Sequence, residues 1–208
     1  MDGVFMRKMI KFAALVLAVS FTLNFFGLVE DKQTMHDSLI RLHVVAASDT
    51  EEDQAVKLQV RDAVITYVET AMQHVMTMEE AKAWLQENLP AIQDAANAVL
   101  EKLGDSHRAV VTFLEEAFPQ RDYDTFSLPS GVYQSLRITI GEGQGHNWWC
   151  VIFPSLCLPA AGESTQTVAA GAGFSQTLTN TLTQQQNYKV RFYFLDVLGK
   201  IENFFFAS

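Results

Sequence analysis

The side chains best suited to chemistry gather in residues 141–157, where a glycine-rich loop precedes two of the three tryptophans and both cysteines. A thiolate at Cys150 with His146 or His43 as its base would form a nucleophilic site, because a thiol needs a nearby proton acceptor. The sequence signatures that surround nucleophilic cysteines in peptidases are absent, and a disulfide to Cys157 would remove the thiol. We therefore expect no catalytic residues in this segment.

Metal and cofactor sites are equally poorly supported. His146, Cys150 and Cys157 lack the paired close spacings of zinc sites and have no obvious fourth ligand. The glycines of residues 141–145 match neither of the common phosphate-binding fingerprints, and a hairpin loop explains them better. The acidic residues between 49 and 53 lack the glycine and the twelve-residue layout of an EF-hand, and helix capping accounts for them. The sequence predicts neither a metal nor a cofactor.

The N-terminal segment predicts export. Arg7, Lys8 and Lys11 precede an apolar run from residue 12 to about residue 28, which is the charge order of a secretory signal. The run is marginal in length for a membrane span, which needs about 20 apolar residues, and no clean small-residue cleavage site is evident. Residues 1–31 are expected to be a signal peptide, or an N-terminal anchor held by residues 7–28 with its positive end in the cytoplasm.

The part that would be exported is acidic. Residues 1–31 hold three basic and three acidic side chains, so the remainder keeps the whole chain's net charge of −9. Nucleic acids and anionic lipids are bound by clustered Lys and Arg, and neither is expected as the main partner. Outside the cytoplasm, two cysteines separated by six residues favour a small-loop disulfide between Cys150 and Cys157 over free thiols.

Hydrophobic periodicity predicts an α+β fold. Residues 39–46 alternate as a half-buried strand, and the apolar spacing of residues 56–72 indicates an amphipathic helix capped by Ser48 or Asp49. Two further helices are expected, at 77–88 after a capping box and at 90–104 ending at a glycine. They are divided before Pro90, because proline disfavours helical geometry at the preceding residue.

The second half of the chain switches to period two, which predicts a small, mainly antiparallel sheet packed on the N-terminal strand and the three helices. Its strands are expected at 109–118, 132–140 and 149–153. The α+β domain is expected over residues 38–158. Residues 159–187 are rich in Ala, Gly, Ser, Thr and Gln and indicate a flexible linker or insertion. A last strand at 188–195 and a short aromatic helix to residue 208 would complete the domain.

Two motifs resemble the stage II sporulation protein R family. The first is Ile-Arg-Leu-His-Val-Val-Ala-Ala-Ser-Asp at residues 40–49, followed by residues 53–64. The second runs through residues 128–157 and contains the Asn-Trp-Trp-Cys block, which is highly specific. The chain departs from the family pattern at Ala47, where asparagine is usual, and at Ser155, where a second proline is usual.

The resemblance implies a role in sporulation signalling. Family members are made in the forespore of endospore-forming Firmicutes and are exported across its membrane into the space facing the mother cell. There they trigger a membrane-embedded aspartic protease that cleaves the precursor of sigma-E. By this resemblance the chain is a secreted protease activator and not an enzyme. It would act on the extracytoplasmic side of that peptidase and touch the membrane only through its N-terminal segment.

Aromatic and arginine side chains dominate protein interfaces, so we expect the contact surface to lie where such side chains are found. Adjacent residues on a strand face opposite ways, so one of the two neighbouring indoles is expected to be buried and the other available. The alternatives are an exported peptidoglycan-active enzyme, using Cys150 or the acidic corner, and a carbohydrate-binding protein with the indoles as its platform. The expected partner-binding residues are Arg41, Asp49, Asp53, His146, Asn147, Trp148 and Trp149.

Overall fold

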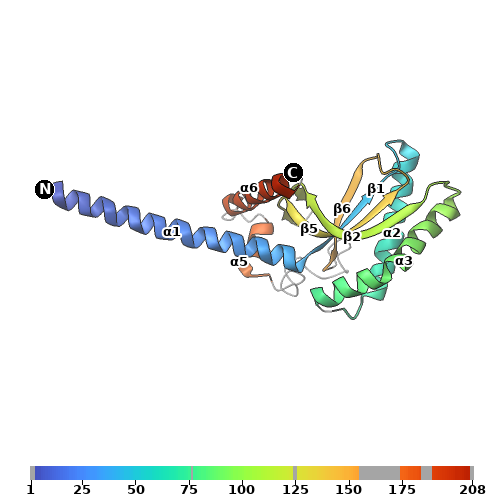
Figure 1. Cartoon of the computed structure of the whole chain (residues 1–208), viewed down its shortest axis with the longest axis horizontal. Helices are drawn as coiled ribbons and strands as arrows, with labels where there is room; N and C mark the ends of the chain where they lie inside the picture. Colours follow the sequence, from blue (N-terminus) through green and yellow to red (C-terminus); the bar gives the residue numbers. More distant parts are fainter. Residues whose placement is uncertain (1–2, 76, 124–125, 155–173, 184–188, 207–208) are drawn as a thin grey trace.

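A computed structural model of the chain describes residues 3–75, 77–123, 126–154, 174–183 and 189–206 (Figure 1). The described part is an α+β fold, as predicted. Its elements in chain order are α1 (Gly3–Ser38), β1 (Ile40–Val45), α2 (Glu51–Ala71), α3 (Met78–Leu103), β2 (Ala109–Phe118), β3 (Arg121–Asp122), β4 (Ser127–Leu128), β5 (Gly131–Ile140), β6 (Asn147–Phe153), α5 (Gln176–Leu182) and α6 (Lys189–Phe206).

Four strands form the central sheet in the order β2-β5-β1-β6, and β3 pairs with β4 in a separate two-stranded sheet. β1 runs parallel to β5 and antiparallel to β6, while β2 is antiparallel to β5, so the sheet is mixed and mainly antiparallel. Leu42 of β1 lies opposite Leu136 on one side and Cys150 on the other. The expected hairpin between β5 and β6 is therefore wrong, because β1 lies between them.

Helices α2 and α3 cover one face of the sheet (Figure 1). The apolar stripes of both helices pack against alternate residues of the strands, which buries a continuous core. Fully buried members of this core include Leu42 and Val44 from β1, Val64 from α2, Ile92 from α3 and Leu136 from β5.

The helix boundaries differ from the prediction in two places. Thr50, and not Ser48 or Asp49, caps α2, because its hydroxyl accepts the backbone N–H of Asp53. The predicted capping box of Thr77 and Glu80 does begin α3, and Gly104 in the left-handed conformation ends it. Pro90 lies inside α3 instead of dividing it, so two helices and not three cover this face. Apolar residues on both sides of Pro90 enter the same core, and this packing outweighs the local cost of proline.

The other face of the sheet is covered by the end of α1 together with α5 and α6 (Figure 1). The strand expected at 188–195 is wrong, because residues 189–195 form the beginning of α6. Residues 174–183 were expected in a flexible linker, but they contain α5, whose Leu178 is fully buried. The rest of the expected linker lies outside the described residues. The second core contains Met35, Leu39, Phe118, Tyr133, Val151, Leu178, Phe192 and Leu195.

Helix α1 projects from the domain, and its apolar side chains from Phe5 to Phe26 are largely exposed (Figure 1). It is the one helix among the described residues that is long and apolar enough to cross a membrane, and a signal sequence has the same properties. This agrees with the expected signal peptide or anchor. Only its last part, from about Leu28 onward, packs against the domain.

Candidate functional site

Two loops meet at the end of β1. Because β1 and β5 are parallel, the β1–α2 loop and the glycine-rich β5–β6 loop leave the same edge of the sheet. The backbone N–H of Gln144 donates to the carbonyl of Ala47 at 3.2 Å, and that of Gly145 donates to Ala46 at 3.0 Å. A Cβ at Gly145 would lie 2.1 Å from the carbonyl oxygen of Ser48, so only glycine allows this approach.

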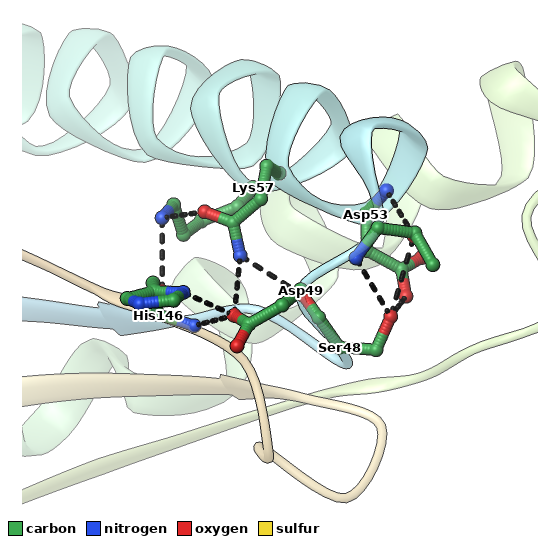
Figure 2. A network of polar contacts seen from close by, with 7 residues as sticks. Ser48, Asp49, Asp53, Lys57 and His146 are labelled. Carbon is green, nitrogen blue, oxygen red and sulfur yellow. Dashed lines mark hydrogen bonds and ion pairs between the residues drawn. The ribbon is translucent and has the colours of Figure 1, made fainter.

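Asp49 and His146 join the two loops (Figure 2). The backbone N–H of His146 donates to Asp49 Oδ1 at 2.6 Å, and the His146 ring nitrogen Nδ1 contacts the same oxygen. These contacts, led by the backbone hydrogen bond, hold the pKa of Asp49 below its ordinary value. The His146 side chain is 79% exposed, so the imidazole is held in place and remains accessible to a partner.

Lys57 fastens this loop to α2 (Figure 2). Lys57 is only 4% exposed, and its ammonium group donates a hydrogen bond to the carbonyl of His146 at 2.9 Å. Burial lowers the pKa of Lys57, while the nearby carboxylate of Asp49 opposes that shift. Gln54, one turn earlier, donates to the carbonyl of Ser48 at 2.9 Å. Through these two side chains, helix α2 holds the β1–α2 loop and the β5–β6 loop in place.

The two tryptophans face opposite sides of the sheet, as the alternation predicts. Trp148 is 37% exposed, and the Arg61 guanidinium carbon lies 4.2 Å from its ring centroid. Trp149 is packed between two side chains, with the Arg121 guanidinium carbon at 3.8 Å and the His43 ring at 5.6 Å from its own centroid. Trp148 is the accessible indole, and Trp149 is the more enclosed one.

These residues line a groove of about 580 Å³ at the end of the sheet. It combines an acid, an imidazole, two amides and two indoles with the guanidinium of Arg121, which suits a polar partner that also offers an apolar group. Five of the seven partner-binding residues expected from the sequence are brought together here. The lining residues are Asp49, Arg121, Gln144, Gly145, His146, Asn147, Trp148 and Trp149.

Arg41 lies outside the groove. Its side chain is fully buried, with its guanidinium carbon 4.1 Å from the ring centroid of Phe118 and its Nη2 donating to the Tyr123 hydroxyl at 3.1 Å. Its Nε and Nη1 have no hydrogen-bond partner among the described residues. Arg41 therefore supports the second core and cannot be a surface contact, because β1 is covered on both faces.

Asp53 also points away from the groove. It accepts a hydrogen bond from the Ser48 hydroxyl (Figure 2). Its carboxylate lies within 4.8 Å of ligand atoms of Asp105 and His107. His107 in turn lies 2.8 Å from Asp105 through its ring nitrogen. Loop contacts account for these three side chains, since each already has a polar partner within the protein.

Cys150 is 7% exposed and belongs to the core beneath α2 and α3. His43 faces the opposite side of the sheet, where it contacts Glu116, and His146 is held by Asp49. The cysteine and histidine pair of the enzymatic alternative is therefore not assembled. Cys157 lies outside the described residues, and the Cys150–Cys157 disulfide stays a prediction.

Sequence reasoning missed three residues that shape the site. Arg61 forms an ion pair with Asp62, at 2.6 Å, and its guanidinium also covers Trp148. Lys57 is a charged residue within the predicted helix and was not among the expected site residues. Its position three residues before the buried Val60 was the available signal, because that spacing places it at the margin of the apolar stripe. No pattern in the sequence around Arg121 indicated that it would line the site.

Comparisons with known proteins agree on one family. The sequence model described as stage II sporulation protein R matches residues 36–163. The stage II sporulation protein R of Bacillus subtilis (strain 168) is 39% identical over 121 residues, which cover 58% of this chain and 54% of that protein. The chain thus spans about half the length of this curated relative. No solved structure matches the chain.

Proposed function

The chain belongs to the stage II sporulation protein R family, and we propose that it is the exported signal that activates the membrane-embedded protease responsible for processing the sigma-E precursor. In this proposal the domain is delivered from the forespore into the intermembrane space and binds the extracytoplasmic side of the peptidase. Activation requires that the domain bind the active state of the peptidase more tightly than the inactive state.

The groove at the end of β1 carries the proposal. The two sequence motifs of the family lie far apart in the chain, and their residues Asp49 and His146 meet through the contacts of the converging loops. Lys57 and Gly145 hold that meeting point rigid, while His146 and Trp148 remain exposed. A rigid groove with an accessible aromatic ring is the usual form of an interface hot spot.

The N-terminal helix supports the route of delivery. Arg7, Lys8 and Lys11 precede its apolar part, so the positive end would stay on the side where the chain is made. The domain would then lie on the opposite side of the membrane, where it can bind the extracytoplasmic side of the peptidase. In the proposed topology the groove lies outside the compartment of synthesis, with residues 1–31 either cleaved or retained.

Co-expression of the full chain with the peptidase and its precursor substrate in a non-sporulating host tests the activation. Precursor cleavage is expected only when the chain is present. Trp148→Ala is expected to lower cleavage about tenfold without changing the melting temperature, because its ring is an exposed contact. Trp149→Ala is expected to lower the melting temperature, because its ring packs between His43 and Arg121.

Leu103→Ala is the matched control, since Leu103 is an apolar side chain of similar exposure outside the groove. It should leave cleavage unchanged. Cleavage that is the same with and without the chain would reject the activator proposal. If Trp148→Ala retains full cleavage activity, the contact surface for the peptidase lies outside the groove.

A carbohydrate-binding role is the second candidate, because Trp148 presents an exposed ring beside the polar side chains of Asp49 and Asn147. Sugar rings stack on such surfaces. Retention of the chain on purified cell wall, and its loss in Trp148→Ala, would favour this role over activation.

A further inference from the structure

Helix α6 has a second apolar face that is exposed in the described part of the chain. Its inner face is buried against the sheet, but six apolar residues on its opposite side are between 48% and 72% exposed. They recur at intervals of three, four and seven residues, which places them on one side of a helix. This outer face of α6 consists of Val190, Tyr193, Phe194, Ile201, Phe204 and Phe205.

The inner face fixes the orientation of α6. Asp196 accepts hydrogen bonds from the backbone N–H and the hydroxyl of Ser130, at 2.9 and 2.7 Å. Gly199 lies so close to the same segment that a Cβ there would be 1.5 Å from the Ser130 carbonyl oxygen. The helix cannot rotate about its axis without breaking these contacts, so the outer face stays directed away from the sheet.

Helix α6 also lies against the point where α1 leaves the domain (Figure 1). Arg191 donates to the carbonyl of Gly27 at 3.0 Å and pairs with Asp31 at 2.6 Å. Gly27 directly follows Phe26, the end of the exposed apolar part of α1. If α1 lies in a bilayer, the first turns of α6 are therefore at the membrane boundary.

We propose that the outer face of α6 inserts into the lipid bilayer interface beside α1. A helix with one exposed apolar face and lysines at the margin of that face is suited to the interface between headgroups and acyl chains. Lys189 and Lys200 lie at one margin of the outer face by the helical repeat, and both are exposed. Tyr193 near the α1 junction is a residue type enriched at this boundary.

Lipid fits this face better than a second copy of the chain. The first turn of α6 lies against Gly27 of α1, next to the exposed apolar stretch of that helix, so one bilayer would contact both surfaces. The attraction is apolar and not electrostatic, because the chain carries a net charge of −9 and the face itself holds no cation cluster. A zwitterionic membrane is therefore the proposed partner.

The first test uses the full chain reconstituted in phosphatidylcholine vesicles that contain a lipid with a photoreactive acyl chain. Mass mapping is expected to find lipid adducts within residues 189–206 as well as on α1. Leu103 and Val110, two exposed apolar side chains on other elements, should remain unlabelled. They control for non-specific labelling.

The second test removes the contribution of α1. Leu15→Lys with Leu17→Lys disables the apolar helix at positions that are 61% and 70% exposed, so the domain is untouched. This full-length chain is expected still to co-float with the vesicles. Adding Phe194→Ser and Phe205→Ser should weaken its partitioning at least about tenfold, because two inserted aromatic rings are lost. Adding Leu103→Ser and Val110→Ser instead should change nothing.

Lipid adducts confined to α1 would overturn the proposal, and so would chain-to-chain crosslinks through α6 without lipid adducts. Loss of flotation in the α1-disabled chain before any change in α6 would overturn it as well. Membrane contact is measured here without the peptidase, so the outcome is independent of the proposed activation.

Discussion

At the scale of single residues, Glu116 is the centre of a polar cluster on the face of the sheet opposite α2 and α3. His43 Nδ1 lies 3.2 Å from its carboxylate, and Arg137 donates to it at 2.9 Å. Burial opposes the ionisation of Glu116, but the hydrogen bond from His43 and the charges of His43 and Arg137 outweigh it. The pKa of Glu116 is therefore lowered.

This cluster predicts a specific acid sensitivity. Because the folded-state pKa of Glu116 is below its ordinary value of 4.5, its ionised form stabilises the fold above that pH. The stabilisation is lost as the pH falls through the lowered pKa. Glu116→Gln should remove this part of the pH dependence when urea unfolding of the full chain in detergent is compared at pH 7 and about pH 3.

Glu101→Gln, at an exposed position of α3, is the matched control for this experiment. It should keep the acid sensitivity of the natural chain. An equal drop in unfolding free energy for Glu116→Gln and the natural chain would show that Glu116 is not the group responsible.

Sequence reasoning at this scale found the polar corner but not all of its members. Asp49, His146 and the two indoles were expected at one surface, and the structure places them in one groove. Arg41 was expected there too, because strand alternation shows which face a residue is on and not what covers that face. Since β1 is an interior strand covered on both sides, its polar face is also buried.

At the scale of the elements, the docking of α6 depends on Gly199. Replacing glycine by alanine inside a helix normally stabilises it by about 1 kcal/mol. Gly199→Ala should do the opposite and lower the thermal stability, because the new Cβ would collide with the Ser130 carbonyl. Val190→Ala, at a 69% exposed position of the same helix, is the control and should have little effect. Gly199→Ala with unchanged or raised stability would contradict the close packing.

The mistaken strand at 188–195 has a physical explanation at this scale. Lys189, Arg191 and Tyr193 alternate with apolar residues over one short window, which is the pattern of a strand. Over the longer window to Phe206, apolar residues recur at the three- and four-residue spacing of a helix, and the short window does not reveal this spacing. The Pro90 error is similar, because local proline chemistry was weighed without the core contacts on either side of it.

At the scale of the whole molecule, α1 is coupled to the domain through buried charge. Asp31 is 8% exposed, and burial raises its pKa against the opposing effect of Arg191. Breaking this pair from either side should cost about 1–3 kcal/mol, because the remaining partner is left partly desolvated.

A double-mutant cycle with Asp31→Asn and Arg191→Gln, measured by urea unfolding in detergent, tests this coupling. The double variant should lose less stability than the sum of the single variants. Lys32 and Glu202 form a more exposed pair at 2.6 Å and provide the control, with an expected coupling of at most about 1 kcal/mol. Additive losses for Asp31 and Arg191 would contradict the coupling.

The sequence predicted the α+β class, the apolar N-terminal segment and most strands, because each depends on a local pattern. It did not predict the strand order, since pairing between β1 and the distant β5 and β6 leaves no local pattern. Two indoles beside a glycine-rich loop were therefore assigned to a hairpin. Their actual neighbour is the first strand of the domain.

The position of β1 between β5 and β6 also constrains the order of assembly during export. In a chain that crosses the membrane from its N-terminal end, β1 is the first strand to emerge, but it lacks β5 until Ile140 has emerged and β6 until Phe153 has emerged. Contacts so distant in sequence form slowly. The sheet is therefore completed late. The polypeptide stays unfolded enough to pass through the translocation channel until the segment that completes the groove has left it.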